Sequence, residues 1–229
     1  MRTVILAGGF GTRLSEETSV IPKPLVQING KPLIIYIMEH YAMYGFNDFI
    51  IATGYKGDKI KEYFDNPKPA NNFKVSVLDT GLNTMTGGRI KRIVESGLID
   101  GTFMLTYGDG VSDVNLKQLL EFHKSHGKTA TITGVRMPRF GIVNIAESGK
   151  VTSFQEKRIE NSPFINGGFM VLEKKVAKYI ENDSTPFETT PMQKLVQDGE
   201  LYAFRHDGFW KCVDSLRDKQ ELEEIVKKW

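Results

Sequence analysis

The sequence opens with MRTVILAGGFGTRLSEETSVIPKPL, residues 1–25, and this stretch decides the fold. Residues 3–7 are a short apolar run, and Gly8, Gly9 and Gly11 follow it at once. A short apolar run that ends in a turn predicts a buried strand. Glycine lets the backbone wrap closely around an anion, because it has no Cβ and tolerates φ and ψ angles that other residues avoid. The order therefore predicts a buried strand followed by an anion-binding loop.

Two basic residues stand close behind this loop. Arg13 offers a planar fork of donors for phosphate oxygens, and Lys23, between two prolines, offers a compact charge. Successive backbone N–H groups of the loop can converge on the same anion. Together these groups suit a triphosphate. The loop lacks the third glycine of a dinucleotide fingerprint, since Leu14 stands there, and it is not a P-loop. A glycine turn that joins a strand to a helix without binding a ligand remains the alternative.

Composition narrows the class of protein. The chain has 229 residues, 40% of them apolar, which is enough for one α/β domain with a large core. With 30 basic and 28 acidic residues the net charge is +2, so we expect neither a nucleic acid nor a membrane as a partner. Cys212 is the single cysteine, which excludes an internal disulfide and a cysteine-rich zinc site. Residues 3–7 are too short for a signal-peptide core, so we expect a cytoplasmic protein.

Strand and helix patterns alternate along most of the chain. After residues 3–7, apolar runs predict strands at 49–52, 75–78, 103–106 and 129–135, and helical spacing predicts helices at 33–44, 56–64, 114–126 and 216–226. This alternation predicts an α/β fold with a Rossmann-like, mostly parallel central sheet and helices on both faces. From Arg139 onward, FGIVNI, SGKVTSFQEK and PFINGGFMVL predict a small antiparallel sheet. No repeat or linker suggests a second domain.

Acidic and histidine side chains are the candidate metal ligands in this sequence. Asp109 follows the strand predicted at 103–106, and open α/β sheets bind ligands at the carboxyl ends of their strands. A carboxylate there can bind magnesium while substrate phosphates and water complete the oxygen shell, although a turn role is the alternative. Asp214 precedes the helix predicted at 216–226, and is most simply its N-cap. His123 and His126 are interpreted as part of a solvated helix face, because no third ligand is near them in sequence.

Longer motifs carry a family resemblance. LAGGFGTRL followed by PKPLVQINGKPLI resembles the signature of the sugar-1-phosphate nucleotidyltransferases. LDTG…MTGGR, LTYGDGVSD, FQEK, INGGF and GFW…D are most similar to the glucose-1-phosphate cytidylyltransferase branch of that family. The resemblance covers nearly the whole chain. It implies transfer of a cytidylyl group from CTP to a hexose 1-phosphate such as glucose 1-phosphate, with Mg²⁺ as cofactor.

The resemblance also assigns roles to residues. It implies nucleotide binding by Leu6, Ala7, Gly8, Gly9, Gly11, Thr12, Arg13, Lys23, Thr84, Gly88, Arg89 and Gly108. It implies catalytic roles for Arg13, Lys23 and Asp109, and magnesium binding by Asp109 and Asp214. The phosphorylated acceptor would contact Gly141, Glu156, Lys157, Asn166 and Gly167, with the small antiparallel sheet as a lid over the acceptor site. The chain would then be one nucleotidyltransferase domain, 1–229, with a nucleotide-binding part at 1–135 and an acceptor-binding part with the final helix at 136–229.

Departures from the family pattern keep alternatives open. We expect a homo-oligomer, but the loop at 65–72 is much shorter than the family's insertion that contributes to subunit packing, so the resemblance does not carry over the subunit number. Arg158 stands where the family usually has proline, so the acceptor could be another sugar phosphate or a non-sugar phosphate. A thymidylyl- or uridylyltransferase is a further alternative. So is a catalytically silent nucleotide-binding subunit, although the joint retention of Arg13, Lys23 and Asp109 argues against it.

Overall fold

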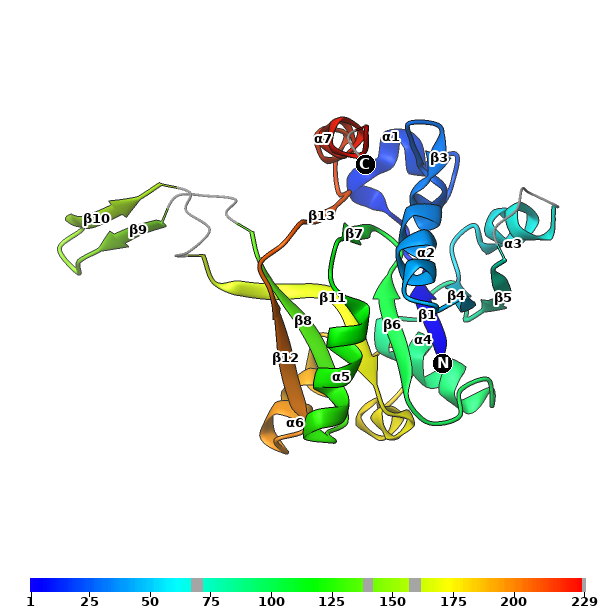
Figure 1. Ribbon diagram of the computed structural model, residues 1–229. Helices are drawn as coiled ribbons and strands as arrows, with labels where there is room; N and C mark the ends of the chain where they lie inside the picture. Colours follow the sequence, from blue (N-terminus) through cyan, green and yellow to red (C-terminus); the bar gives the residue numbers. More distant parts are fainter. Residues whose placement is uncertain (67–71, 138–141, 157–161, 228–229) are drawn as a thin grey trace.

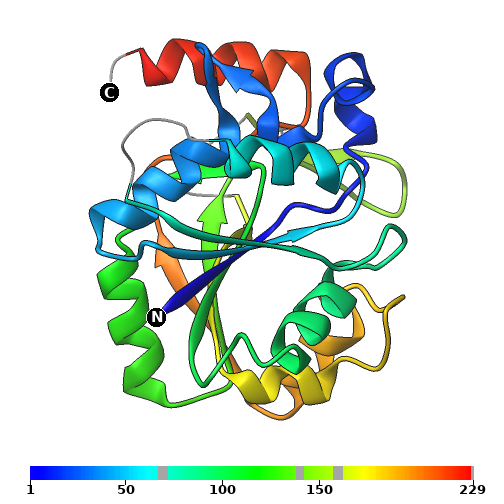
Figure 2. The same ribbon diagram turned by 90° about the vertical axis from the view of Figure 1, so that its right-hand side faces the viewer.

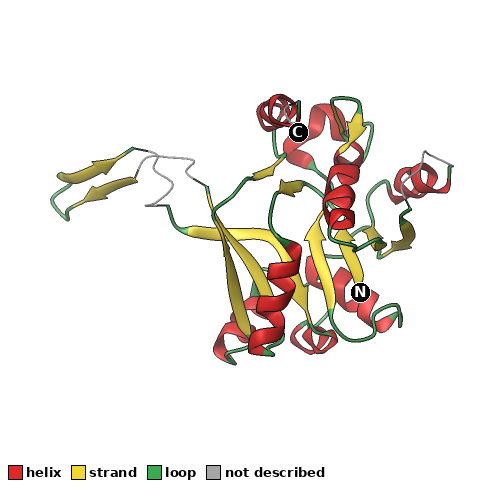
Figure 3. Ribbon diagram, in the orientation of Figure 1, coloured by secondary structure: helices red, strands yellow, loops and turns green. Residues whose placement is uncertain are grey.

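The computed structural model describes residues 1–66, 72–137, 142–156 and 162–227, and a mixed sheet lies at the centre of this part of the chain (Figures 1 and 3). Within these residues the sheet has seven strands in the order β12-β8-β11-β6-β1-β4-β5. Neighbouring strands run parallel except at β11, which is antiparallel to both β6 and β8. The strands are β1 (Arg2–Leu6), β4 (Asp48–Thr53), β5 (Lys74–Asp79), β6 (Phe103–Tyr107), β8 (Ala130–Arg136), β11 (Phe164–Leu172) and β12 (Leu201–His206). The predicted fold class is confirmed.

Side-chain alternation along β1 explains why the sheet is covered on both faces. Val4 and Leu6 belong to one buried cluster and Ile5 and Ala7 to the other, because successive residues of a strand point to opposite faces. One face packs against α2 (Leu33–Met43), α3 (Gly57–Asp65) and α5 (Leu116–His126). The other packs against α4 (Thr86–Glu95), the 3-10 helix η4 (Lys174–Tyr179) and α6 (Thr190–Gln197). Figure 2 shows α2 and α3 above β1 and α4 below it.

Short elements surround the carboxyl ends of β1 and β6. After β1 come the 3-10 turn η1 (Thr12–Leu14), α1 (Ser15–Thr18), the 3-10 turn η2 (Lys23–Leu25), and the two-residue strands β2 (Gln27–Ile28) and β3 (Lys31–Pro32). After β6 comes β7 (Gly110–Ser112), which pairs with β13 (Trp210–Cys212) just before α7 (Leu216–Val226). A separate ribbon, β9 (Ile142–Ile145) with β10 (Val151–Gln155), extends away from the body of the molecule (Figure 1).

The assignment of the third antiparallel segment differs from the sequence prediction. Of the three segments predicted to form the small sheet, the first two, β9 and β10, pair as an antiparallel ribbon, whereas the third, β11, lies inside the central sheet between β6 and β8. The reason is the run at 169–172, Phe-Met-Val-Leu, whose side chains are all buried and are divided between the two core clusters. A strand that is apolar on both faces belongs in the middle of a covered sheet. The edge strand β12 and helix α6 were not predicted.

The interpretation of the histidine pair as a solvated face is wrong for His123. This side chain is 2% exposed, with Nδ1 hydrogen-bonded to Thr131 Oγ1 at 2.8 Å and Nε2 to Glu173 Oε1 at 3.1 Å. His126 Nε2 meets the same threonine hydroxyl at 2.8 Å. In the part of the chain that the structure describes, no three His, Cys, Asp or Glu side chains gather as a metal site. The same residues include no helix with the length and apolar character needed to cross a bilayer.

Candidate active site

The glycine loop leaves the sheet at the carboxyl end of β1. Ala7 N still donates to Ala52 O of β4 at 2.8 Å, so the turn begins at the sheet edge. Gly11 has a φ of +65°, and a Cβ there would come within 2.9 Å of the Thr18 side chain. Within the described residues, the N–H groups of Gly9, Phe10 and Gly11 donate to no protein acceptor. Unpaired N–H groups that lie in sequence along a turn are the donors that an anion needs.

A cavity of about 560 Å³ lies over this edge, and most of the implied nucleotide-binding residues line it. Its volume is within the range of small-molecule sites. The expected residues that line it are Leu6, Ala7, Gly8, Gly9, Gly11, Thr12, Arg13, Lys23, Thr84, Arg89, Gly108 and Asp109. Gly88 is the exception. A Cβ on Gly88 would come within 2.6 Å of Asp183 Cα and O, so this glycine allows α4 to pack closely against residues 182–185.

The β7–β13 ribbon brings Asp214 beside Asp109, 105 positions earlier in the sequence. Gly110 pairs with Cys212 in an antiparallel register, and Val213 N donates to Asp109 O at 3.0 Å. Asp109 is one residue before the ribbon begins on one strand, and Asp214 is two residues after it ends on the other. Antiparallel pairing therefore places both carboxylates at the same end of the ribbon, next to the cavity.

Both carboxylates converge on one ammonium group. Lys23 Nζ lies 2.7 Å from Asp109 Oδ2 and 2.7 Å from Asp214 Oδ1, and Arg13 Nη1 lies 2.5 Å from Asp214 Oδ2. The Lys23 side chain is 12% exposed. Burial by itself would lower the pKa of Lys23, but Asp109 and Asp214 together outweigh it and raise the pKa. Lys23 is therefore held as a cation between two anions.

The same geometry tests whether a metal fits. Two carboxylate oxygens that meet one cation from two sides are suitable ligands for a divalent ion in place of the ammonium group. Magnesium seldom takes all its ligands from the protein, so two carboxylates are enough when substrate phosphates and water supply the rest. Asp109 and Asp214 would hold such an ion.

The expected capping role of Asp214 is wrong. The N-cap of α7 is Ser215, whose Oγ accepts from Asp218 N at 3.2 Å, and Ser215 Oγ donates to Asp218 Oδ2 at 2.8 Å. Because Ser215 satisfies the start of the helix, the Asp214 carboxylate stays free to face Arg13 and Lys23.

Arg89 is a buried residue of the cavity lining. Its side chain is 4% exposed, and its Nη1 donates to Thr53 O at 2.7 Å and to Gly81 O at 2.9 Å. Its Nη2 donates to Gly8 O at 3.0 Å. Burial lowers the pKa of Arg89, with a smaller opposing effect of Asp79. This guanidinium thus ties the glycine loop to the loop after β5, and a Cβ on Gly8 would lie 2.3 Å from it.

The implied acceptor residues are only partly placed. Asn166 Nδ2 donates at 3.4 Å to the hydroxyl of Tyr107, which lines the cavity. Gly167 O accepts from Trp210 Nε1 at 2.7 Å. Glu156 is exposed at the end of β10, on the projecting ribbon. Gly141 and Lys157 lie outside the described residues.

Sequence reasoning missed some of the lining residues. They are Phe10, Pro24, Leu82, Asn83, Met85, Thr86 and Tyr107. Each stands within or directly beside a quoted motif, so position alone could have identified them. Their chemistry differs from that of the motif residues, because they supply aromatic, apolar and hydroxyl groups rather than charge.

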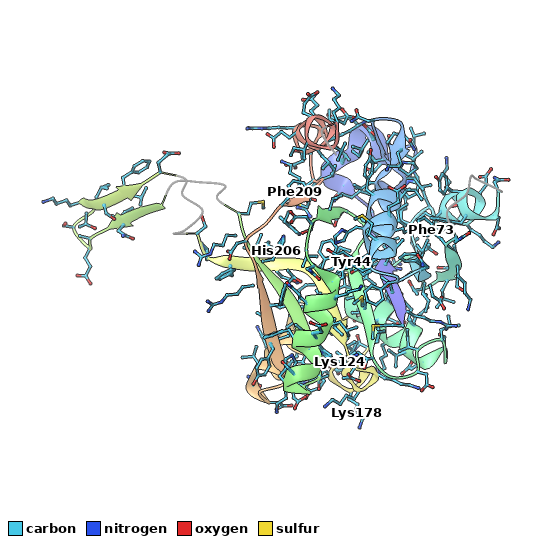
Figure 4. All side chains as sticks on the ribbon, in the orientation of Figure 1. Tyr44, Phe73, Lys124, Lys178, His206 and Phe209 are labelled. Carbon is cyan, nitrogen blue, oxygen red and sulfur yellow. The ribbon has the colours of Figure 1, made fainter. Side chains whose placement is uncertain are left out.

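A histidine supports the ribbon that carries Asp214. His206 and Phe209 lie together near the centre of Figure 4, and His206 Nε2 is 3.2 Å from Phe209 O. The same Nε2 is 2.9 Å from Asp113 Oδ1 and 3.2 Å from Ser112 Oγ. A hydrolytic triad needs its acid and its serine on different ring nitrogens. This cluster therefore anchors the turn before β13 and is not a nucleophile–base pair.

Comparison with known proteins adds a second line of argument. Residues 2–226 match the family described as nucleotidyl transferase. The chain is 48% identical to a glucose-1-phosphate cytidylyltransferase of Salmonella typhi over 249 aligned residues, which cover 100% of this chain and 96% of the relative. It is 42% identical to a probable glucose-1-phosphate cytidylyltransferase of Bacillus subtilis, again over 100% of this chain and 96% of the relative.

A solved structure supports the same relationship. HddC from Yersinia pseudotuberculosis, in a crystal structure complexed with GMP-PN, has a TM-score of 0.77 and 30% sequence identity to this chain. The similarity covers 98% of this chain and 99% of that one. The fold of that nucleotide complex and the fold described above are thus alike over their full lengths.

Proposed function

Because this chain belongs to the nucleotidyl transferase family, we propose that it transfers a cytidylyl group from CTP to glucose 1-phosphate, giving CDP-glucose and pyrophosphate. The chain is an enzyme, a nucleotidyltransferase. Two relatives that align over its whole length, at 48% and 42% identity, carry the cytidylyltransferase description. The observation that supports the proposal most is that the glycine loop, Lys23, Asp109 and Asp214 meet at one edge of one cavity.

The proposed reaction needs positioning more than acid–base chemistry. The acceptor phosphate is already anionic near neutral pH, since its second pKa is about 6, so no general base has to activate it. Its oxygen attacks the α-phosphorus of CTP in line with the departing pyrophosphate. The barrier comes largely from bringing anions together, and cationic groups reduce that repulsion.

We assign these cationic roles by position. Arg13, 72% exposed at the cavity rim, holds the departing pyrophosphate. Lys23 contacts the α-phosphate and the charge that develops on it. Lys157, which lies outside the described residues, is proposed to hold the acceptor phosphate. The glycine-loop N–H groups cradle the remaining phosphate oxygens.

We further propose magnesium as the metal. The family generally uses a divalent metal, and Asp109 and Asp214 offer the two carboxylates for it. When bound, the ion neutralises charge on the phosphate oxygens. With an ion held by the two carboxylates, the Lys23 ammonium would be available to the α-phosphate.

The remaining proposals concern the chain as a whole. Residues 1–135 are assigned to nucleotide binding, and residues 136–229 to acceptor binding and the final helix. We expect a homo-oligomer, in the cytoplasm. The loop that carries Thr84 is assigned to recognition of the base, because its backbone carbonyls can accept from the 4-amino group of cytosine, which uracil and thymine lack.

Pyrophosphate release tests the proposal directly. The protein is assayed with each of CTP, UTP, dTTP and GTP against glucose 1-phosphate, mannose 1-phosphate and a non-sugar phosphate, with and without Mg²⁺. We expect turnover with CTP and glucose 1-phosphate that stops when EDTA removes the metal. Turnover with another nucleotide and none with CTP would contradict the assigned base, and no turnover with any pair would contradict the proposed function.

A further inference from the structure

The base loop, as we call the loop at 80–85 that carries Thr84, leads into α4 at Thr86. From Thr86, side-chain hydrogen bonds run through Glu188 and Tyr107 to Asn166 on β11. Thr86 Oγ1 donates to Glu188 Oε2 at 2.6 Å, and Tyr107 Oη donates to Glu188 Oε1. Asn166 Nδ2 in turn donates to Tyr107 Oη at 3.4 Å. Thr86 and Tyr107 both line the cavity. Glu188 therefore joins two lining residues that belong to α4 and β6, and no role above accounts for it.

The backbone around this chain is built to hold it. Thr86 Oγ1 also accepts from Phe187 N at 2.8 Å, which fixes the residue next to Glu188 against the start of α4. Figure 2 shows the yellow-orange segment around 180–189 beside the teal-green α4. On the other side, the register of β11 against β8 shifts between Asn166 and Met170. A bulge of this kind redirects a side chain, and here it brings Asn166 to the tyrosine.

Gly168, in this bulge, leaves room for the Tyr107 ring beside β11. Gly168 has a φ of +84°, and a Cβ on it would come within 2.5 Å of the Tyr107 ring. Burial raises the pKa of Tyr107, and the neighbouring Glu188 carboxylate raises it further. The phenol thus stays protonated at neutral pH and acts as a donor to Glu188.

The charge of Glu188 indicates what this wall can bind. Its carboxylate is exposed, and within the described residues it forms no ion pair with a lysine, arginine or histidine. Such a carboxylate repels a phosphate but accepts hydrogen bonds from hydroxyl groups. The cationic side chains Arg13 and Lys23 stand at the phosphate end of the same cavity. Glu188 is not itself a lining residue, but Thr86 and Tyr107, which hold its carboxylate, are, so the carboxylate offers hydrogen-bond acceptors beside the cavity.

We propose that Glu188, held by Tyr107 and Thr86, is a specificity-determining residue that accepts hydrogen bonds from hydroxyl groups of the acceptor sugar. This inference rests on the proposed sugar-phosphate transfer and adds a residue to it. The acceptor sugar is favoured over the nucleotide ribose because the hydrogen-bond chain reaches Asn166 on β11, a residue that the family resemblance assigns to the acceptor. The phosphate of the acceptor then points toward Lys23, and its hydroxyls point toward Glu188.

The test compares Glu188→Gln and Tyr107→Phe with the wild-type enzyme in the pyrophosphate-release assay. Glu181→Gln is the matched control, because Glu181 is an exposed carboxylate on the same connection between η4 and α6. The KM for glucose 1-phosphate and for CTP are measured separately, and thermal midpoints report folding. A series of 2-, 3-, 4- and 6-deoxyglucose 1-phosphates asks which hydroxyl the carboxylate meets.

We expect Glu188→Gln to raise the KM for glucose 1-phosphate about tenfold or more, as for loss of one charge-assisted hydrogen bond. The KM for CTP stays within about twofold. Wild-type enzyme should discriminate against at least one deoxy sugar phosphate, and Glu188→Gln should lose that discrimination. Glu181→Gln should behave as wild type. Tyr107→Phe should reproduce part of the effect, because Glu188 loses one of its two donors.

Several outcomes would overturn the inference. An unchanged KM for glucose 1-phosphate would do so, and a rise in the KM for CTP alone would assign Glu188 to the ribose. If Glu188→Gln has a lower thermal midpoint but still discriminates between the sugars, Glu188 has only a structural role. Glu188→Asp, which keeps the charge, is the second variant for the same comparison. An inactive wild-type enzyme would instead contradict the proposed function, so the two failures are distinguishable.

Discussion

Lys23 balances the charge of two carboxylates that the β7–β13 pairing brings close together. Asp109 and Asp214 would repel each other across the end of the ribbon, and the ammonium group between them offsets that repulsion. The same ammonium is the group that we assign to the α-phosphate. The proposed function thus gives Lys23 a catalytic role in addition to the ion pairs that it forms with both carboxylates.

Removing Lys23 or Asp109 should therefore stop catalysis without unfolding the protein. We expect Lys23→Ala and Asp109→Ala each to lose at least about 3 kcal/mol of transition-state stabilisation, more than a hundredfold in kcat/KM. Pyrophosphate release measures the rate, and circular dichroism with thermal unfolding checks the fold. Lys59→Ala, which removes an exposed lysine on α3, is the control. A rate near wild type in either variant would refute the assignment.

Arg89 is a buried cation whose described partners are carbonyl and hydroxyl groups. Thr53 O, Gly81 O and Gly8 O accept from it. Thr53 O and Gly8 O also accept from Thr80 N and Tyr55 N, so within the described residues Arg89→Met would leave Gly81 O without a donor and would remove the link between the three carbonyls. We expect a loss of at least about 2 kcal/mol in the free energy of unfolding, together with a higher KM for CTP, because the glycine loop loses its tie. Urea unfolding and steady-state kinetics measure the two effects. Arg217→Met, at an exposed site on α7, should change neither quantity by a comparable amount.

At the scale of elements, the Glu200 carboxylate helps to hold the edge strand β12 beside β8. Glu200 precedes β12 and accepts from Thr129 N at 2.9 Å and from the Thr129 hydroxyl, and it pairs with Lys175 at 3.1 Å. The Thr129 hydroxyl first, then Lys175, lowers the pKa of Glu200 from 4.5 to about 2. These contacts tie β12 to the start of β8, although β12 itself has largely exposed or half-buried side chains.

The sign of this shift gives a pH dependence. Because the folded-state pKa lies below the unfolded-state value, the stabilisation by Glu200 is complete above about pH 4.5 and is lost as the pH falls toward about 2. We expect Glu200→Gln to lower the melting temperature at pH 7 by about 2 to 4 °C, and to weaken its fall between pH 4.5 and pH 2. Thermal unfolding across that pH range measures both, with Glu95→Gln on α4 as the control. A variant with the wild-type pH profile would show that Glu200 does not contribute.

At the scale of the whole molecule, the cavity joins segments from residues 6 to 109, and Asp214 lies beside it. The glycine loop, the base loop and the end of β6 line it, and the ribbon that precedes α7 supplies Asp214. A ligand that contacts all of them stabilises the folded state and not the unfolded chain. At a hundred times its dissociation constant it adds about 2.7 kcal/mol.

Nucleotide binding should therefore be visible as a thermal shift. For a domain of this size we expect CTP with Mg²⁺ to raise the melting temperature by about 5 to 10 °C at saturating concentration. UTP and dTTP should give smaller shifts, since they lack the 4-amino donor of cytosine. Equal shifts for all nucleotides would indicate that the protein recognises only the phosphates.

Much of this molecule could be read from short stretches of sequence. The strand and glycine-loop order at 1–25 predicted the carboxyl edge of β1, and the apolar runs predicted most of the parallel strands within a residue or two. These features depend on neighbouring residues, so local patterns carry them. The edge strand β12 was missed because its side chains are half-buried or exposed and leave no apolar run.

The sequence by itself determined the α/β fold and the chemistry of the glycine loop, because backbone preference and hydrophobic alternation are local properties. It could not determine that β11 enters the central sheet or that Glu188 meets Tyr107. Those outcomes depend on contacts between residues tens of positions apart, and only the packed chain brings such residues within hydrogen-bonding distance.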